Sequence, residues 1–313
     1  DLIRQHFTKA TRHTNLGVGD DAALISLSAG MELAISADML VAGTHFFADA
    51  DAYKLGWKSL AVNVSDMAAM GAKPKWATLA IALPSNDSAW LGQFSNGFFA
   101  CAKAHDIDLI GGDTTRGPLT ISVQIMGEVP NGQAIKRSGA QVGDEIWVSG
   151  NLGDAALALA HMQGKLKLAD ADFSSCATAL HTPQPRVALG LALRSMANSA
   201  IDISDGLLAD LGHILAASKV GAELRLQALP KSHVMKNYCS NKLTLTMILA
   251  GGDDYELCFT APTERHAELV SLSALLDLKL SNIGHITQDN GLTMRGPDNE
   301  ILNFKETGFD HFN

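Results

Sequence analysis

Hydrophobic and polar positions along the chain form two patterns, short apolar runs and longer stretches with an apolar residue every three or four positions. The short runs predict β-strands and the longer stretches predict amphipathic helices. The predicted strands cover residues 32–36, 76–83, 120–127 and 145–149. The predicted helices cover residues 52–70, 88–104, 154–162, 186–196, 207–218 and 264–276. Strands and helices that alternate in this way indicate a mixed α/β fold.

A polar stretch, residues 133–143, separates two of the strand runs and interrupts both patterns. Polar segments that contain glycine are typical of the connections between compact regions. We therefore expect one domain in residues 1–137 and a second in residues 138–313, both of ordinary domain size. Within the first domain, the helix at 52–70 is expected to end at Gly71, because a C-terminal glycine stops helices and Pro74 follows it.

The composition narrows the class of protein. The chain has 313 residues, of which 47% are hydrophobic and 18% are charged, as in globular proteins. The formal net charge is −9 and no basic run is present, which argues against a nucleic-acid partner. No apolar run reaches the ~18 residues of a membrane helix. Four widely spaced cysteines suit a reducing compartment. We expect a soluble cytoplasmic protein with no membrane partner.

Aspartates recur at the ends of apolar runs, next to small residues. A single Gly-Asp pair favours a turn, because both residues suit turn geometry. Four such motifs favour a site, since α/β proteins place their sites at strand ends. Carboxylate oxygens are ligands for magnesium, and glycine lets backbone N–H groups approach phosphate. The motifs are GVGDDAAL (17–24), LIGGDTTRG (109–117), IDISDGL (201–207) and LAGGDDYEL (249–257), with further acids at Asp38 and Asp66.

One helix face carries polar residues among apolar neighbours. In the helix at 52–70, Ser59, Asn63 and Asp66 follow one another at intervals of four and three residues, so they share a face. A buried carboxylate without a partner is unfavourable. Asp66 is therefore expected to face a metal, a hydrogen-bond donor or a water-filled cleft. The alternative is a solvated helix face.

The segment WVSGNLGDAALAL (147–159) predicts a strand, a glycine loop and a helix that begins near Asp154. Helix N-termini bind anions, so this loop is a candidate phosphate site. The alternative is that Asp154 is only an N-cap residue. The chain contains no Walker A motif, no GxGxxG and no kinase HRD or DFG set, so an ATP site here is of another kind.

The remaining candidates are single residues. Arg116 and Arg137 are cations that suit phosphate contacts, although either also suits a surface ion pair. His45 and His311 are isolated, and a lone histidine is more often structural than catalytic. The sequence contains no persuasive nucleophile triad.

Eight segments, in order along the chain, resemble the thiamine-monophosphate kinase family. They are GVGDDAAL, AISADMLVAGTHF, LAVNVSDMAAMGAKP, LIGGDTTRG, RSGAQVGD, AIDISDGL, LAGGDDYEL and GFDHF. The resemblance implies the two-domain α/β (α+β) fold of aminoimidazole ribonucleotide synthetase and a homodimer whose N-terminal domains join their sheets across the two-fold axis. The C-terminal domain would complete the ATP and substrate site.

The same resemblance implies ATP as co-substrate, several Mg²⁺ ions as cofactors, and direct in-line transfer of the γ-phosphoryl group to thiamine monophosphate. No catalytic side chain is then required, because phosphate oxygen is a competent nucleophile and metals offset the repulsion between the phosphates. The implied metal ligands are Asp21, Ser36, Asp38, Asp66, Asp113, Asp202 and Asp205. The implied ATP contacts are Gly112, Asp113, Arg137 and Ser204, and the implied substrate contacts are His45, Asp253 and Phe309.

Two other functions compete with this interpretation. Another ATP-dependent enzyme of the superfamily, such as a selenophosphate synthetase, would need a reactive cysteine in a glycine-rich N-terminal segment. No cysteine precedes Cys101. A non-catalytic metal- or nucleotide-binding protein would use the acids only to anchor ions, and loss of several acids would favour it.

Overall fold

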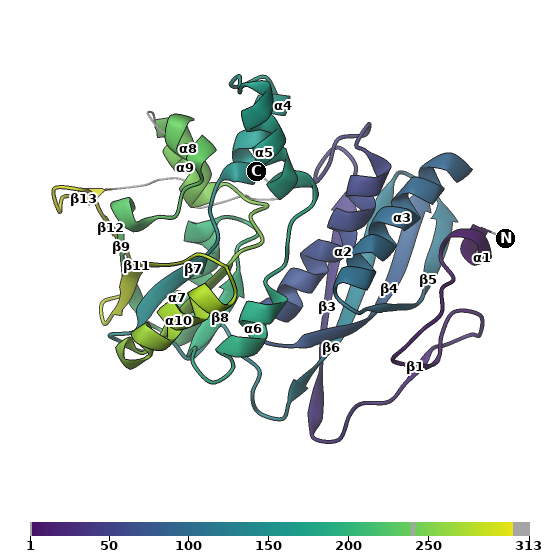
Figure 1. Cartoon of the computed structure of the whole chain (residues 1–313), viewed down its shortest axis with the longest axis horizontal. Helices are drawn as coiled ribbons and strands as arrows, with labels where there is room; N and C mark the ends of the chain where they lie inside the picture. Colours follow the sequence, from purple (N-terminus) through teal and green to yellow (C-terminus); the bar gives the residue numbers. More distant parts are fainter. Residues whose placement is uncertain (1, 239–241, 303–313) are drawn as a thin grey trace. The chain divides into compact units, whose positions relative to one another are not determined.

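The computed structural model describes residues 2–238 and 242–302 (Figure 1). The chain divides into two compact units. We call Asp1–Met67 with Ala72–Ala134 the N-terminal unit, and Ala68–Gly71 with Ile135–Asn313 the C-terminal unit. Within the described residues, no helix is both long and apolar enough to cross a membrane. Cys101, Cys176 and Cys258 are buried free thiols, and Cys239 lies outside the described residues.

The N-terminal unit is built on a four-stranded sheet in the order β3-β6-β4-β5, in which only β4 and β5 are parallel. Figure 1 shows α2 and α3 side by side across one face of this sheet. A short pair, β1 and β2, precedes it. The elements are α1 (Leu2–His6), β1 (Thr14–Leu16), β2 (Leu24–Ile25), β3 (Met31–Val41), α2 (Ala52–Ala69), β4 (Lys73–Leu83), α3 (Ser88–Ala104), β5 (Asp108–Arg116) and β6 (Thr120–Pro130).

Strand β3 shows how the two faces of this sheet differ. Its side chains alternate between the faces, because successive residues of a strand point in opposite directions. Leu40 is buried toward the helices at 6% exposure. Ile35 and Met39, on the other face, are 56% and 57% exposed. One face of the sheet is therefore covered by helices. The other is covered in part by the β1–β2 segment, where Ile25 packs on the buried Trp76 and Met126, and it is open around Ile35 and Met39.

The C-terminal unit contains a seven-stranded sheet in the order β13-β12-β9-β11-β7-β10-β8, with β12 and β9 as its parallel pair. Its strands are β7 (Glu145–Ser149), β8 (Ser199–Asp202), β9 (Gly221–Arg225), β10 (Leu257–Ala261), β11 (Leu280–Thr287), β12 (Gly291–Arg295) and β13 (Ile301–Leu302). Its helices are α4 (Asp154–Met162), α5 (Asp170–His181), α6 (Val187–Leu193), α7 (Leu207–Ser218), α8 (His233–Tyr238), α9 (Lys242–Ala250) and α10 (His266–Leu275).

Two hydrophobic cores lie on the two faces of this sheet. Ile146 and Val148 of β7 belong to the core that also contains residues of α4 and α7. Trp147, between them, belongs to the other core, with residues of α6 and α10. This alternation is expected for a strand that is buried on both faces. The unit thus has three layers, with the sheet in the middle.

The predicted helices at 88–104, 154–162 and 207–218 and the strand at 145–149 have the observed bounds. Helix α2 ends as expected, since Gly71 adopts φ +62° and Ala72 N–H donates to the Met67 carbonyl. Strand β3 is longer than predicted, and the helix predicted at 186–196 is shorter. All but the last residue of the motif at 109–117 lies inside strand β5 rather than in a turn, because β4 pairs with β5 along its length.

Candidate active site

Three predicted metal ligands of the N-terminal unit lie where α2 packs on β3. The Ser36 hydroxyl donates to Asp66 Oδ2 at 2.6 Å. The Asp38 backbone N–H donates to Asn63 Oδ1 at 3.1 Å, and the Asn63 amide in turn donates to the Ser59 carbonyl. The polar helix face predicted from residue spacing therefore meets the strand, and it gathers two carboxylates and a hydroxyl at one place.

Asp113 lies elsewhere in the same unit. Across the sheet it aligns with Ala80, Ser122 and Met39 in neighbouring strands. Met39 faces the open side of the sheet, whereas Asp38 precedes it and faces the helices. The side chains of Asp113 and Asp38 therefore project from opposite faces and from opposite edge strands, and one copy of the unit does not bring them together.

Asp21 lies in the exposed loop between β1 and β2. Asp108, which is 6% exposed, anchors the start of this segment. Its carboxylate accepts hydrogen bonds from the backbone of Arg12 and His13, at 2.8 and 2.6 Å, and from the Thr14 hydroxyl at 2.8 Å. The N-terminal segment that carries Asp21 is thus tied to strand β5.

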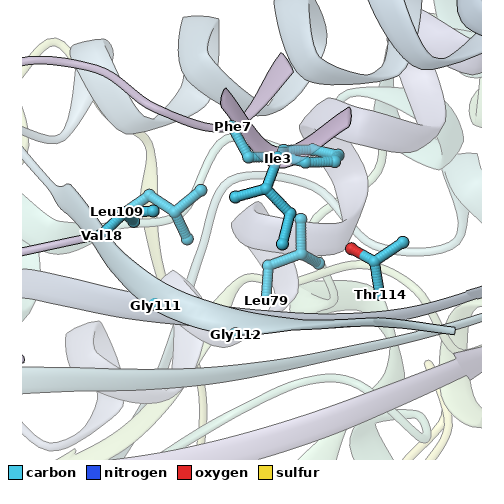
Figure 2. Close-up of a pocket in the computed structure, with 8 residues that line it drawn as sticks. All are labelled: Ile3, Phe7, Val18, Leu79, Leu109, Gly111, Gly112 and Thr114. Carbon is cyan, nitrogen blue, oxygen red and sulfur yellow. The ribbon is translucent and has the colours of Figure 1, made fainter. Parts of the chain in front are cut away.

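A small apolar pocket lies beside Gly112, the predicted ATP contact on β5. Figure 2 shows Ile3 and Phe7, from the N-terminal segment, above Leu79 and Thr114 of the sheet. Gly112 has no room for a side chain, since a Cβ there would lie 1.8 Å from the Leu79 carbonyl oxygen. The lining residues are Ile3, Phe7, Val18, Leu79, Leu109, Gly111, Gly112 and Thr114.

In the C-terminal unit, the loop after β8 and the loop before β10 lie against each other. Asp253 N–H donates to the Ser204 carbonyl at 2.9 Å, and Tyr255 N–H donates to the Ile203 carbonyl at 2.8 Å. Asp253 and Tyr255 adopt φ +69° and +49°, which is uncommon for residues with side chains and occurs at functional sites. This arrangement brings predicted residues Ser204 and Asp205 next to predicted Asp253.

Arg137 is held at the other end of helix α7. The Ser218 hydroxyl donates to the Arg137 carbonyl and accepts hydrogen bonds from the N–H groups of Gly139 and Ala140. Ser204 precedes the N-terminus of the same helix, and twelve helical residues span ~18 Å. The two predicted ATP contacts of this unit therefore lie apart.

The remaining predicted residues have varied settings. Asp202 is the last residue of β8 and is 5% exposed. His45 Nδ1 accepts a hydrogen bond from the backbone N–H of Val41 at 3.0 Å, so this ring nitrogen stabilises the turn after β3. Phe309 and His311 lie outside the described residues.

Comparisons with known proteins identify the family. Residues 19–129 match the N-terminal domain of AIR synthase related proteins, and residues 141–296 match the C-terminal domain. A thiamine-monophosphate kinase of Escherichia coli K12 is 47% identical over 99% of this chain and 97% of its own length. The chain belongs to the thiamine-monophosphate kinase family. The resemblance inferred from the motifs and the two-domain fold are thereby confirmed.

Solved structures agree with this family assignment. A thiamine-monophosphate kinase from Stenotrophomonas maltophilia superposes with a TM-score of 0.87 at 49% identity, covering 93% of this chain and 92% of its own. A second structure, AaThiL complexed with AMPPCP and TMP, gives a TM-score of 0.80 at 30% identity and covers 94% and 92% of the two chains.

A carboxyl group of the chain lies at the start of helix α4, where the sequence suggested a phosphate site. Gly153 is its N-cap residue, and the Gly153 N–H donates to Asp254 Oδ1 at 2.9 Å. Asp154 is the first residue of the helix rather than its N-cap, and its Oδ1 accepts a hydrogen bond from the Ser232 hydroxyl at 2.6 Å. Burial raises the pKa of the Asp254 carboxyl well above its ordinary value. A carboxyl group of the same chain thus occupies the helix start.

The Asp253 loop is followed by a partly buried ion pair between Arg186 and Glu256, which the sequence analysis did not single out. Glu256 is 5% exposed and accepts hydrogen bonds from both the Arg186 guanidinium and the Ser149 hydroxyl. Gly150, at φ +61°, permits this close approach, since a Cβ there would lie 1.9 Å from Glu256 Oε1 as it stands. Its sequence signal was an acid directly after the GGDDY motif.

Asp210 was also missed. It lies in the first turn of α7 and is 3% exposed, and its Oδ2 accepts three backbone N–H groups of the loop after β8. Burial raises the pKa of this carboxyl to about 7, although the N–H donors oppose the shift. The available signal was an acid in the first turn after a glycine N-cap.

The donor set of the predicted metal residues fits Mg²⁺, the metal implied for this kinase family. Ser36, Asp38 and Asp66 present only oxygen atoms, and Mg²⁺ takes one or two carboxylates together with water and substrate phosphate. Within residues 2–238 and 242–302, no group of three or more acidic, histidine or cysteine side chains forms a ready-made metal cluster. The two carboxylates beside Ser36 are consistent with a site that substrate phosphates complete.

Proposed function

We propose that this protein phosphorylates thiamine monophosphate to thiamine diphosphate with ATP as co-substrate. The observation that carries the proposal is the 47% identity over nearly the whole length of a thiamine-monophosphate kinase. The related structure, AaThiL complexed with AMPPCP and TMP, supports the choice of substrates, since AMPPCP is an ATP analogue. A cytoplasmic location belongs to the same proposal, and the three buried free thiols support it.

Within this function we propose roles for the predicted residues. Mg²⁺ supplies charge neutralisation between the phosphates when it is bound. In the N-terminal unit, Ser36 and Asp66 are pre-oriented by their 2.6 Å hydrogen bond, so little rearrangement is needed for binding. The proposed metal ligands are Asp21, Ser36, Asp38, Asp66, Asp113, Asp202 and Asp205. The proposed ATP contacts are Gly112, Asp113, Arg137 and Ser204, and the proposed substrate contacts are His45, Asp253 and Phe309.

The side chains orient and bind the substrates in this proposal rather than react covalently. Phosphate oxygen attacks the γ-phosphorus of ATP directly, and the bond to the leaving ADP oxygen breaks. Asp253 provides a negative charge for the cationic thiazolium ring, and the Tyr255 hydroxyl, which donates to Asp253 Oδ1 at 3.0 Å, orients that carboxylate. This division of roles needs no serine or histidine nucleophile.

We also propose a homodimer in which the sheets of two N-terminal units join. The open face of the N-terminal sheet, with exposed Ile35 and Met39, supports this proposal, because a partner copy would bury these side chains. Residues 1–137 would form the metal-binding and dimerisation domain, and residues 138–313 would contribute the loops that carry Ser204 and Asp253. Thiamine monophosphate and ATP are the other proposed partners.

Product analysis tests the function. Incubation with ATP, Mg²⁺ and thiamine monophosphate should yield thiamine diphosphate and ADP in equal amounts. Asp66→Asn should lower kcat at least about 100-fold, since it removes a metal ligand. The matched control is Asp170→Asn, an exposed acid at the start of α5, which should leave kcat unchanged.

Two results would contradict the proposal. Formation of ADP and free phosphate without thiamine diphosphate would support the proposed ATP site but contradict thiamine monophosphate as the acceptor. No ATP turnover in the wild-type protein would favour the non-catalytic binding protein.

A further inference from the structure

A single carboxylate oxygen organises the loop that carries Ser204 and Asp205. Asp210 Oδ2 accepts hydrogen bonds from the consecutive N–H groups of Ser204, Asp205 and Gly206, at 3.0, 3.1 and 3.1 Å. Asp210 is 3% exposed, so water does not replace it readily. Three successive N–H groups that converge on one point form a concave anion-binding nest. Here the chain fills this nest with its own side chain.

The start of α7 explains why the loop depends on that side chain. The N-cap residue is Gly206, at φ +112°, and it has no side chain to satisfy the first N–H groups of the helix. In most helices a Ser, Thr, Asp or Asn at this position would do so. Asp210, one turn into the helix, instead folds back onto the N–H groups that precede the helix, those of Ser204, Asp205 and the N-cap residue Gly206. The glycine is required for a close approach, since a Cβ on Gly206 would lie 2.8 Å from the Ala250 backbone.

The same loop is held from its other side by the Asp253 loop. The Ser204 N–H bonds to Asp210, and the Ser204 carbonyl accepts from Asp253 N–H at 2.9 Å. A Cβ on Gly252 would lie 2.5 Å from that carbonyl oxygen, so the two loops are in close contact. A change in the path of residues 204–206 would therefore also move the backbone at Asp253.

We propose that Asp210 is a positioning residue for the phosphoryl transfer, a role that rests on the proposed function. It fixes the backbone of Ser204 and Asp205, so that the Asp205 carboxylate is presented to Mg²⁺ and Ser204 to the nucleotide. In this proposal Asp210 acts on both through the loop, since its Oδ2 accepts the three backbone N–H groups.

The test compares Asp210→Ala and Asp210→Asn with a matched control, Asp87→Ala. Asp87 is the N-cap residue of α3 and accepts N–H groups of Ala89 and Trp90, so its loss also removes a carboxylate cap from a helix start. It belongs to the N-terminal unit and none of the proposed site residues is bound to it. Two quantities are measured. The first is the rate of amide hydrogen exchange at residues 204–206 in metal-free protein, and the second is the Mg²⁺ concentration that gives half of the maximal turnover rate.

The proposal expects Asp210→Ala to speed exchange at residues 204–206 at least tenfold and to raise the half-saturating Mg²⁺ at least tenfold. Asp210→Asn should lie between wild type and alanine, because its amide oxygen still accepts hydrogen bonds but carries no charge. Asp87→Ala should change both quantities less than twofold while lowering Tm. If Asp210→Ala does not fold, Asp210→Asn is used instead. The proposal then expects this variant to raise both the exchange rate at residues 204–206 and the half-saturating Mg²⁺ concentration at least threefold.

The proposal is overturned if the Asp210 variants lower Tm but leave exchange at 204–206 and the Mg²⁺ requirement within twofold of wild type. Asp210 would then be a simple helix cap. If the wild-type protein forms no thiamine diphosphate, the proposed function is contradicted, which is a separate outcome from the role of Asp210. The exchange measurement needs no turnover, so it still decides whether Asp210 holds the loop.

Discussion

Glu128 ties the loop before β3 to the sheet of the N-terminal unit. Its carboxylate is 2.6 Å from Lys75 Nζ and accepts hydrogen bonds from the backbone and hydroxyl of Ser28. Burial alone would raise the pKa of Glu128, but the bonds from Lys75 and Ser28 outweigh it and hold the pKa below its ordinary range. A depressed pKa in the folded state stabilises the protein above the unfolded pKa, and this stabilisation is lost as pH falls.

We therefore predict that Glu128→Gln lowers the free energy of unfolding by about 2 kcal/mol near neutral pH. The difference from wild type should shrink from about pH 5 downward, as the wild-type carboxylate becomes protonated. Urea unfolding at several pH values measures this. Glu268→Gln, which breaks an exposed pair with Arg265 on α10, is the control and should cost less than about 0.5 kcal/mol. A difference that is constant down to pH 3 would contradict the prediction.

The sequence allowed some site residues to be predicted because local geometry decides their arrangement. Ser59, Asn63 and Asp66 share a face in any helix, and Asp66 meets a hydrogen-bond donor, the Ser36 hydroxyl, which is one of the expected partners. Asp210 was not predictable in this way, since its partners are three N–H groups whose convergence depends on the turn after β8. For Asp113, the face of the sheet became known only from strand pairing.

Helices α2 and α3 approach so closely that their glycines contact the facing backbone. A Cβ on Gly97 would lie 1.8 Å from the Tyr53 carbonyl oxygen, and a Cβ on Gly56 would lie 2.0 Å from the Phe94 carbonyl oxygen. A methyl group at either position must push the helices apart, because packed interiors do not absorb added volume. Glycine here serves the helix–helix contact, although it weakens each helix alone.

We predict that Gly97→Ala destabilises the protein by about 1–3 kcal/mol, measured as the free energy of unfolding in urea. The matched control is Gly92→Ala in the same helix. Its Cβ would meet nothing closer than 4.0 Å, so the substitution should be neutral or stabilise by up to about 1 kcal/mol. If both variants lose stability equally, the close approach of the helices is not the cause.

At the level of elements, the predictable parts were those with clear end signals. Helix α3 begins after Asp87, whose side chain caps it, and α2 ends at Gly71. Strand β5 was not predicted, because its glycines suggest a turn and its extended path depends on pairing with β4. Strand β13 of the C-terminal unit has only two residues, too few for a periodic pattern.

For the whole molecule, the break in pattern at residues 133–143 predicted two domains, with the boundary between residues 137 and 138. The contacts place the division between Ala134 and Ile135, with Ala68–Gly71 joining the second unit. That last feature was not predictable, because Gly190 of α6 packs against Ala68 across more than 100 residues of sequence. Long-range contacts of this kind leave no trace in local periodicity.

The homodimer provides the last prediction. Ile35 and Met39 lie on the open face of the N-terminal sheet, four residues apart on β3, and each is more than half exposed. If this face is the interface, Ile35→Lys together with Met39→Lys places two ammonium groups in a dry contact, where unpaired charge is strongly unfavourable. We expect the dimer dissociation constant to rise at least about 100-fold, which corresponds to ~2.7 kcal/mol.

Light scattering coupled to size-exclusion chromatography measures the mass of each variant at several concentrations. Val270→Lys is the control, because Val270 is an exposed apolar residue on α10, 52% exposed, in the other unit. It should leave the mass unchanged. A double variant that remains dimeric at the concentrations of the wild type would place the interface elsewhere, and a monomeric wild-type protein would reject the dimer. A monomeric double variant with a wild-type Tm would show that the apolar side chains of β3 serve association rather than folding.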